Sequence, residues 1–392
     1  MNAPVKQHLI DPEICIRCHS CEAACPIGAI EHDGRNVVVK ADACNYCMSC
    51  IPVCPTGSID NWRVVLAPYS LAEQYDWSEL PPQGGPSAGA TVEATDPAVA
   101  ALLAEAHAGS EGAARAPASA QKPTINLYTA AKPVEAVVQG NYRLIAENSG
   151  ADVRHIILSF EGRPFPALEG QSLGVIAPGE DAQGRAHAPR LYSVSSPRDG
   201  ERPGFNNVAI TVKRDPGGVC SNYICDLAKG DRVRIAGPFG ATFLMPDEPQ
   251  ARLLMIATGT GAAPFRAFTM RRQRAATRGG DMTLFFGART PDSLPYFGPL
   301  NKIPNRLLRK HMVFSRIPGA AKEYVQDRLL VEGEEIAEML GDSRTHIYIC
   351  GLRGMEEGVE KAFVSIAESV GVSWGALRQV LREEGRYHVE TY

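Results

Sequence analysis

Eight of the eleven cysteines lie within the first 54 residues, in two runs of identical spacing. Each run reads Cys-x2-Cys-x2-Cys-x3-Cys-Pro, and a shift of 29 positions places Cys15 on Cys44 and Cys25 on Cys54. A duplicated half of this size cannot bury a core alone, so the two halves must pack around something that they share. In a long chain, such a cluster of cysteines indicates metal or redox chemistry rather than a disulfide scaffold.

This spacing is the bacterial ferredoxin run, in which the fourth cysteine ligates the other cluster. Three cysteines two residues apart can wrap one corner of an iron–sulfur cube, while the fourth faces across from the next turn. Zinc is the competing metal, but zinc sites usually separate two Cys-x2-Cys pairs by a longer stretch. His19 is expected to be a solvated neighbour, because the thiolate ligands are already complete. The sequence predicts two [4Fe–4S] clusters, one on Cys15, Cys18, Cys21 and Cys54 and one on Cys25, Cys44, Cys47 and Cys50.

Composition excludes some classes of function. Forty Lys and Arg against 44 Asp and Glu leave a net charge of −4, whereas nucleic-acid binders usually carry a basic excess. We therefore expect no nucleic-acid partner. No apolar run reaches the ~18 residues that a membrane span needs, and the start of the chain lacks the apolar stretch of a signal peptide. A soluble, cytoplasmic protein without a membrane partner is expected, and a homodimer is left open.

Four segments differ in pattern along the chain. Residues 1–63 form the cysteine-rich module, and residues 64–123 are a linker rich in Ala, Gly and Pro. Within the linker, Asp96 and Pro97 resemble the start of a helix over 96–108, which either docks or is a free linker helix. Short β-branched runs in 124–248 predict an antiparallel barrel. In 249–392, apolar strands alternate with helical stretches such as 323–340, which predicts a parallel α/β sheet.

Several motifs in the second half occur in the order of one known family. The chain from about 136 to 392 resembles plant-type ferredoxin–NADP reductase. That resemblance implies a multidomain fold of a dicluster ferredoxin module, an FAD-binding barrel and an NADP-binding α/β domain. The motifs are RLYSVSS (190–196), GGVCSNYICDLAKGD (217–231), ATGTGAAPFR (257–266), ICGLRGMEEG (349–358), the ending YHVETY and EGQSLGVI (169–176).

The FAD site follows from the first two motifs. Arg190 offers a fork for a diphosphate oxygen, Tyr192 offers a ring to stack on the flavin, and Ser193 places a hydroxyl near flavin N5. By the resemblance, backbone N–H groups of the second motif cradle the pyrophosphate, and the terminal ring of Tyr392 covers the flavin. The predicted FAD residues are Arg190, Leu191, Tyr192, Ser193, Gly218, Val219, Cys220, Ser221 and Tyr392.

The nicotinamide nucleotide site begins at the glycine-rich motif, which follows a strand and opens a helix. The next strand ends in Gly-Ala-Arg, without the acid that would hold a free ribose 2′-hydroxyl, so NADPH is favoured over NADH. By the resemblance, Tyr324 stacks on adenine, and Ser193, Cys350, Glu390 and Tyr392 are the catalytic residues. The predicted NADP residues are Thr258, Gly259, Thr260, Gly261, Arg289, Ser315, Arg316, Lys322, Tyr324, Gln326, Gly351 and Leu352.

A fusion of these modules orders the cofactors. FAD accepts a hydride and releases single electrons, and each cluster carries one electron, so electrons pass from NADPH through FAD to the clusters. The fused chain also resembles the reductase components of benzoyl-CoA 2,3-epoxidases, whose partner is a separate diiron oxygenase. Two alternatives remain: reduction of NADP from low-potential clusters, and an electron carrier for another partner.

Overall fold

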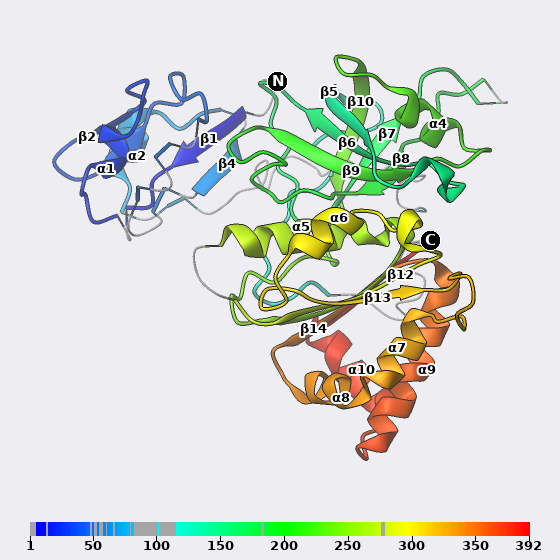
Figure 1. Cartoon of the computed structure of the whole chain (residues 1–392). Helices are drawn as coiled ribbons and strands as arrows, with labels where there is room; N and C mark the ends of the chain where they lie inside the picture. The colour runs from blue at the N-terminus through cyan, green and yellow to red at the C-terminus, as the bar shows by residue number, and fades with distance from the viewer. Residues whose placement is uncertain are drawn as a thin grey trace. The chain divides into compact units, whose positions relative to one another are not determined.

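The computed structural model describes residues 5–12, 15–47, 49–50, 53–54, 58–59, 61–65, 67–78, 80–81, 101, 115–181, 184–275 and 279–392. The helix predicted over 96–108 lies outside these residues, except for Ala101. The chain divides into two compact units. The first unit comprises 1–93 with two later segments, 160–166 and 202–207, and the second unit comprises the remainder (Figure 1).

The first unit is built from short strands around a small core. Its elements are β1 (Val5–Leu9), α1 (Ser20–Ala23), β2 (Ile30–His32), β3 (Val37–Val39), β4 (Asn61–Val65) and α2 (Leu71–Asp76). β1 pairs with β4 and β2 pairs with β3, both antiparallel. The buried core residues are Ile10, Cys21, Ile30, Val37, Val39 and Ile59, and five further cysteines pack against them.

Helix α2 lies in the range that composition predicts as linker. Ser70 and Glu73 form a capping box at its start, which fixes where the helix begins. The buried amide of Gln74 donates to the Val39 carbonyl at 3.0 Å and accepts from the Val39 N–H at 3.1 Å. These two bonds attach α2 to β3, so ordered structure extends beyond residue 63. The boundaries between the four predicted segments remain predictions.

The first half of the second unit is an antiparallel sheet in the order β8-β7-β10-β5-β6-β9. A bridge between Val194 and Ile210 joins the β8 end to the β9 end, which closes the sheet into the predicted barrel. In β5, a shift of register between Val138 and Gly140 interrupts the regular pairing with β6. The elements are β5 (Val134–Arg143), η1 (Glu147–Ser149), β6 (Val153–Ser159), β7 (Ser172–Ile176), β8 (Arg190–Ser193), β9 (Asn207–Lys213), α4 (Val219–Asp226) and β10 (Arg232–Phe239).

The second half is a parallel sheet in the order β13-β12-β11-β14-β15. Alternate residues of each strand enter two cores: Leu254 and Ile256 face one, and Leu253 and Met255 face the other. Helices cover both faces, which is why the strands read as continuous apolar runs (Figure 1). The elements are β11 (Arg252–Thr258), η2 (Gly259–Gly261), α5 (Ala262–Arg274), β12 (Met282–Ala288), η3 (Pro291–Ser293), α6 (Phe297–Lys302), β13 (Arg309–Phe314), α7 (Val325–Val331), α8 (Gly333–Gly341), β14 (Thr345–Gly351), α9 (Arg353–Ser369), α10 (Trp374–Glu383) and β15 (Tyr387–Thr391).

The parallel-sheet half differs from its prediction in one detail. The helical stretch predicted over 323–340 is two helices, α7 and α8, with the junction at Glu332. Glu332 has φ −91° and ψ 25°, which is outside the helical region and ends the first helix.

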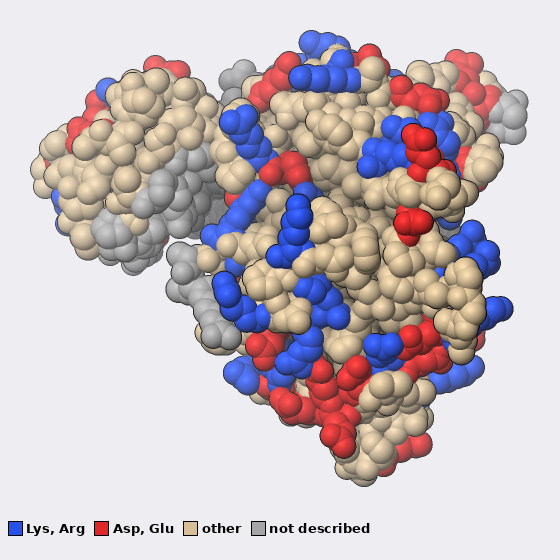
Figure 2. Space-filling model, viewed as in Figure 1, with Lys and Arg blue, Asp and Glu red and all other residues tan. Residues whose placement is uncertain are grey.

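Two features of the sequence, its nearly balanced charge and its lack of long apolar runs, are also found in the folded chain. Figure 2 shows basic and acidic side chains interspersed over the visible face of the second unit. Among the described residues, no helix combines the length and the apolar character needed to cross a bilayer.

Candidate functional site

The cysteine runs adopt matching local structures in the two repeats. Arg17 and Tyr46 stand 29 positions apart, and both have positive φ, 55° and 57°. Non-glycine residues seldom adopt this conformation, and here it precedes Cys18 in one run and Cys47 in the other. The repeat therefore extends from the cysteine spacing to the backbone that presents the thiols.

Hydrogen bonds to sulfur also recur between the repeats. The Ala29 N–H donates to Cys25 Sγ at 3.2 Å, and Ser58 Oγ lies 3.3 Å from Cys54 Sγ, 29 positions later. Hydrogen bonds from Ser20 lower the pKa of the Cys18 thiol, and hydrogen bonds from Ser49 lower the pKa of Cys47 in the same way. Donors that stabilise a thiolate suit metal ligation and tune the potential of a bound cluster.

The structure brings the thiols together in two groups. A cavity of the first unit is lined by Cys25, Cys44, Cys47 and Cys50. Burial raises the pKa of Cys50 to about 11, so in the absence of a metal this thiol is protonated. All eight sulfurs are free of disulfides.

The other group surrounds Cys21. Burial raises the pKa of this thiol, and charge on Cys15 and Cys54 raises it further. Cys54 also acts on Cys18, so these four thiols are electrostatic neighbours. Two sets of four thiols are the donor sets that cubane clusters require, and the residues present therefore fit such clusters. The assignment of one cluster to each set remains a prediction.

The predicted FAD residues meet where β8 approaches the N-terminus of α4. Tyr192 is half-buried on β8 and hydrogen-bonds to Cys220 in the first turn of α4. Burial raises the pKa of the Cys220 thiol, while the Tyr192 bond and the charge of Arg190 partly offset it. Arg190 itself is exposed. An arginine and an aromatic ring beside a helix N-terminus form a suitable site for a diphosphate attached to a flat ring.

The remaining predicted FAD residues support this arrangement. Leu191 packs on the barrel core, and Ser193 is half-buried at the end of β8. Gly218 caps α4, and a Cβ there would lie 2.6 Å from Ser221 Oγ, so a side chain would crowd the turn. Val219 is 58% exposed at the helix start. The loop can therefore lie close to a bound group, and these residues fit FAD.

The predicted nicotinamide residues gather where the parallel sheet changes direction. The chain passes from β11 to β12 and β13 on one side, then to β14 and β15 on the other. Ligands of open α/β sheets bind at the carboxyl ends of strands at this switch point. Thr258 ends β11, and its Oγ1 accepts from the Leu352 N–H at 3.2 Å, just after β14. A Cβ on Gly261 would lie 2.1 Å from the Cys350 carbonyl oxygen, so only glycine permits this approach.

Cys350 and Glu390 are cross-strand partners at the same edge and both are buried. Burial raises the pKa of Glu390 to about 8 and that of Cys350 well above its usual range. Both groups are therefore neutral at pH 7. Tyr392 is 53% exposed, and its hydroxyl hydrogen-bonds to Thr260 in η2. The predicted catalytic residues of the sheet thus lie beside the predicted glycine-rich loop, which includes Gly259 at the start of η2.

The predicted 2′-phosphate residues follow the next two strands. Arg289 follows β12 and Arg316 follows β13, and the Arg316 N–H donates to the Arg289 carbonyl at 2.8 Å. The side chains of Arg289, Arg316 and Lys322 are exposed, and none forms an ion pair with an acid in the described part of the chain. Ser315 is bonded through its N–H to Ala288. Unpaired cations at the carboxyl edge of the sheet fit a phosphate ligand.

Two residues predicted to bind the nucleotide have side chains in different surroundings. Tyr324 is 47% exposed at the start of α7, in a position open to a stacking base. Gln326, two residues later, faces α9, because a Cβ on Gly358 would lie 2.7 Å from its Cδ. The Gln326 side chain therefore packs against α9, and its role in nucleotide binding remains a prediction.

Known proteins share both modules. Residues 255–361 match the oxidoreductase NAD-binding domain, and residues 14–58 match the 4Fe-4S dicluster domain. The chain is 39% identical over 288 residues to the ferredoxin–NADP reductase of the cyanelle of Cyanophora paradoxa, covering 68% of this chain and 79% of that protein. It is 37% identical to the ferredoxin–NADP reductase of Thermosynechococcus vestitus, covering 68% and 75%. This chain belongs to the ferredoxin–NADP reductase family.

The structural comparison agrees. The ferredoxin–NADP+ reductase of Plasmodium falciparum, solved with 2′P-AMP, superposes with a TM-score of 0.56 and 26% identity, covering 69% of this chain and all of that one. A ferredoxin–NADP reductase is an FAD-dependent oxidoreductase that acts with NADP in electron transfer. Here that enzyme carries an additional 4Fe-4S dicluster domain, which confirms the predicted fold class.

Sequence reasoning missed a buried junction between the two halves of this ferredoxin–NADP reductase. Arg266 of α5 donates to both carboxylate oxygens of Glu201 at 2.7 and 2.6 Å, and to the Ser195 carbonyl at 2.7 Å. The burial of Glu201 would raise its pKa, but hydrogen bonds from His155 and Arg266 outweigh burial and lower that pKa to about 2. The junction therefore holds a charged pair that links the barrel to the NADP-binding half.

A tyrosine continues the same junction. The Tyr296 hydroxyl lies 2.6 Å from Thr211 Oγ1 and 2.9 Å from His155 Nδ1. Arg266 ends the glycine-rich motif and could have been singled out there, whereas Glu201, His155 and Tyr296 stand in no motif. Only their contacts across the fold reveal their role.

Proposed function

We propose that this chain is an NADPH-dependent reductase that delivers electrons through FAD and two [4Fe–4S] clusters to a separate diiron oxygenase. The observation that carries the proposal is the presence of two sets of four thiols in a chain that is otherwise a ferredoxin–NADP reductase. When bound, FAD supplies the conversion of a hydride into single electrons, and each cluster carries one electron. A chain with its own ferredoxin module needs no separate ferredoxin between flavin and acceptor.

The choice of NADPH rests on the exposed cations. Arg289, Arg316 and Lys322 would hold the 2′-phosphate by charge-assisted hydrogen bonds, and Tyr324 would stack on adenine. Support comes from the absence of a described acid paired with these cations, and from the relative in Plasmodium falciparum that was solved with 2′P-AMP.

The reactive end is assigned to the switch-point residues. Thr258 and Gly261 let the chain approach the nicotinamide closely, while Cys350 and Glu390 border it from β14 and β15. With a pKa of about 8, Glu390 carries a proton at neutral pH that it can donate through its carboxyl oxygen. The ring of Tyr392 would cover the flavin until nicotinamide replaces it, and its bond to Thr260 would hold it in place.

The acceptor is proposed from the resemblance of the fused chain to reductase components of benzoyl-CoA 2,3-epoxidases. The oxygenase would bind and epoxidise benzoyl-CoA during aerobic degradation of aromatic compounds, and this chain would supply electrons only. Residues 1–62 of the cysteine-rich module hold seven acids against four bases, which favours an oxygenase with a basic docking face.

The test is anaerobic mixing of the protein with NADPH, followed by addition of the oxygenase while flavin and cluster absorbance are recorded. We expect NADPH to bleach the flavin first and the clusters second, and the oxygenase with benzoyl-CoA and dioxygen to restore both. Clusters that stay oxidised under NADPH, yet reduce NADP when loaded with electrons, would show the opposite direction of flow. Reoxidation by ferredoxin-accepting enzymes but not by the oxygenase would reject the partner.

A further inference from the structure

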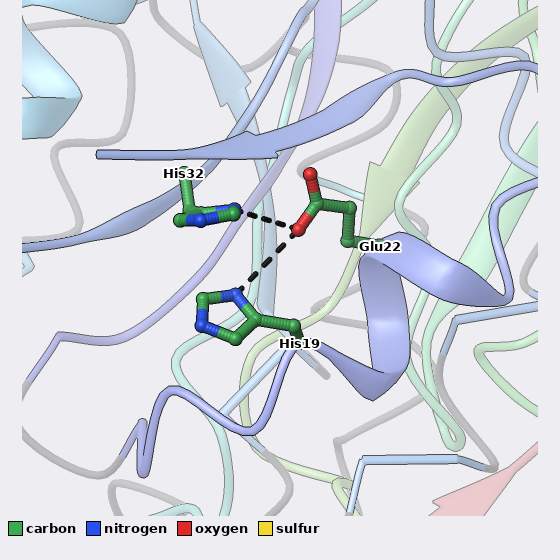
Figure 3. Close-up of side chains that lie close together, drawn as sticks. All are labelled: His19, Glu22 and His32. Carbon is green, nitrogen blue, oxygen red and sulfur yellow. Dashed lines mark hydrogen bonds and ion pairs between the residues drawn. The ribbon is translucent and has the colours of Figure 1, made fainter. Parts of the chain in front are cut away.

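Two histidines and a glutamate of the first unit converge on one point, outside the two sets of thiols (Figure 3). His19 caps α1, Glu22 lies within α1, and His32 ends β2. His32 Nδ1 lies 2.7 Å from Glu22 Oε2, and His19 Nδ1 lies 3.5 Å from the same oxygen. The three atoms all lie within 4.8 Å of one another.

The arrangement leaves one nitrogen without a hydrogen bond. His19 Nδ1 is buried and has no hydrogen-bond partner among the described residues, although the side chain itself is 42% exposed. The two imidazole rings lie 4.0 Å apart between centroids, at 47° to one another. Their Nδ1 atoms therefore face a shared carboxylate oxygen.

A nearby lysine, Lys40, is paired with another acid. Lys40 acts on Glu22 electrostatically, but its ammonium pairs with Glu31 at 2.7 Å. The Glu22 carboxylate thus remains available to a further cation. The three side chains are between 31% and 43% exposed, so an ion has access from solvent.

Two imidazoles and one carboxylate are a ligand set typical of Zn²⁺, at ~2.0–2.2 Å from each donor atom. Donors at that length around a tetrahedral ion stand roughly 3.4 Å apart. The separation of His19 Nδ1 and Glu22 Oε2 already has this size, and the His32 contact must lengthen by several tenths of an ångström. We propose that His19, Glu22 and His32 form a Zn²⁺ site, with the fourth position open to water.

Such a site would fasten the loop that carries the first set of thiols. His19 follows Cys18 and Glu22 follows Cys21, while His32 belongs to the β2–β3 hairpin. An ion bound to all three would tie α1 to β2 and restrict the motions that release a cluster. We expect bound Zn²⁺ to slow the loss of cluster iron to a chelator.

The test is titration of the complete protein, loaded with clusters and flavin, with Zn²⁺ in competition with a chromogenic indicator. We expect one equivalent to bind, and His32→Ala to weaken that binding by about tenfold or more. The matched control is His187→Ala, which removes a histidine of the second unit and should leave binding unchanged. Equal Zn²⁺ affinity in His32→Ala and the unsubstituted protein overturns the proposal.

A second variant and a second measurement distinguish zinc bound at this site from zinc that has replaced cluster iron on the cysteines. Glu22→Gln keeps the side-chain shape and removes the charge, so we expect it to weaken binding even if His32→Ala loads its clusters poorly. Zinc X-ray absorption separates the possible ligands, since nitrogen and oxygen lie at ~2.0–2.1 Å and thiolate sulfur at ~2.3 Å. Nitrogen and oxygen ligands with full iron content support the site. Sulfur ligands, or iron released as zinc binds, overturn it.

Discussion

Each of the two units is stabilised internally in a different way. In the first unit, the described core cluster beside the thiols holds six buried residues, and five cysteines border it. In the second unit, the parallel sheet alone has two large cores, one on each face. A small unit whose core is edged by thiols depends on its inorganic ligands for stability, whereas a sheet covered by helices on both faces is stable through apolar burial. The comparison teaches that loss of one cofactor type should spare the other unit.

The largest expected effect is confined to the first unit. Cys21→Ala removes a buried thiol of the first set, so we expect loss of a cluster and of all electron delivery to the oxygenase. NADPH–ferricyanide activity should remain, because ferricyanide takes electrons directly from the flavin. Iron analysis and both activity assays check this. Loss of ferricyanide activity with FAD still bound would show that the units are not independent.

The next effect concerns the junction inside the second unit. Glu201→Gln leaves Arg266 buried without its charged partner, which costs ~3–5 kcal/mol of unfolding free energy. Cluster absorbance should not change. Differential scanning calorimetry of the variant checks the loss, and Glu135→Gln, which affects an exposed ion pair with Arg232, is the matched control with ~0–1 kcal/mol expected.

The same carboxylate predicts how pH acts on the second unit. The pKa of Glu201 is about 2 in the folded chain and ~4.3 in the unfolded chain. The stability that its carboxylate contributes is therefore fully present above pH ~4.3 and is lost as the pH falls through 2. Stability should therefore fall as the pH drops from ~5 toward 2, and Glu201→Gln should show a smaller fall. Thermal unfolding followed by flavin fluorescence across this range checks the slope. A slope unchanged by the substitution would assign the acid sensitivity to other carboxylates.

A smaller effect concerns nucleotide choice. Arg316→Ala removes an exposed cation from the predicted phosphate site, and a charge-assisted bond contributes ~1.5–3 kcal/mol. We expect the KM for NADPH to rise roughly tenfold or more, with little change for NADH and none in cluster content. Steady-state kinetics with both nucleotides check this, and equal losses for both would make Arg316 structural.

The smallest effects lie at the end of the chain. Tyr392→Ser removes the ring that bonds to Thr260, so we expect tighter NADP+ binding, slower release and lower turnover. Equilibrium titration with NADP+ and the flavin spectrum check this. Unchanged affinity and an unchanged spectrum would show that the ring does not cover the flavin.

The carboxyl group of Glu390, near the chain end, predicts how activity depends on pH. Because burial raises the pKa of Glu390 to about 8, hydride transfer should decline as the pH rises through 8 and the proton is lost. Glu390→Gln should remove that inflection from the pH profile of kcat while the first unit keeps its clusters. An inflection that persists in the variant belongs to another group.

The sequence by itself determined the parts whose chemistry is local. Cysteine spacing predicts the thiol sets because three ligands of each cluster stand three residues apart and the repeat supplies the fourth, and the matched backbone at Arg17 and Tyr46 follows the same repeat. Alternation of strands and helices predicts the parallel sheet, and the structure then pairs β11 with β14, which places Thr258 and Cys350 at one edge. These features can be predicted from the sequence because each depends on short-range geometry or on a motif with a characteristic local structure.

Only the tertiary structure decided which distant residues meet. Glu201 and Arg266 are 65 positions apart, and His155 and Tyr296 are 141 apart, so no local pattern marks either pair. The raised pKa of Glu390 likewise comes from burial in the folded chain. His32 approaches Glu22 because a hairpin returns toward α1. Burial and long-range contact depend on how the whole chain packs, and therefore electrostatics at these sites could not be read before the fold was known.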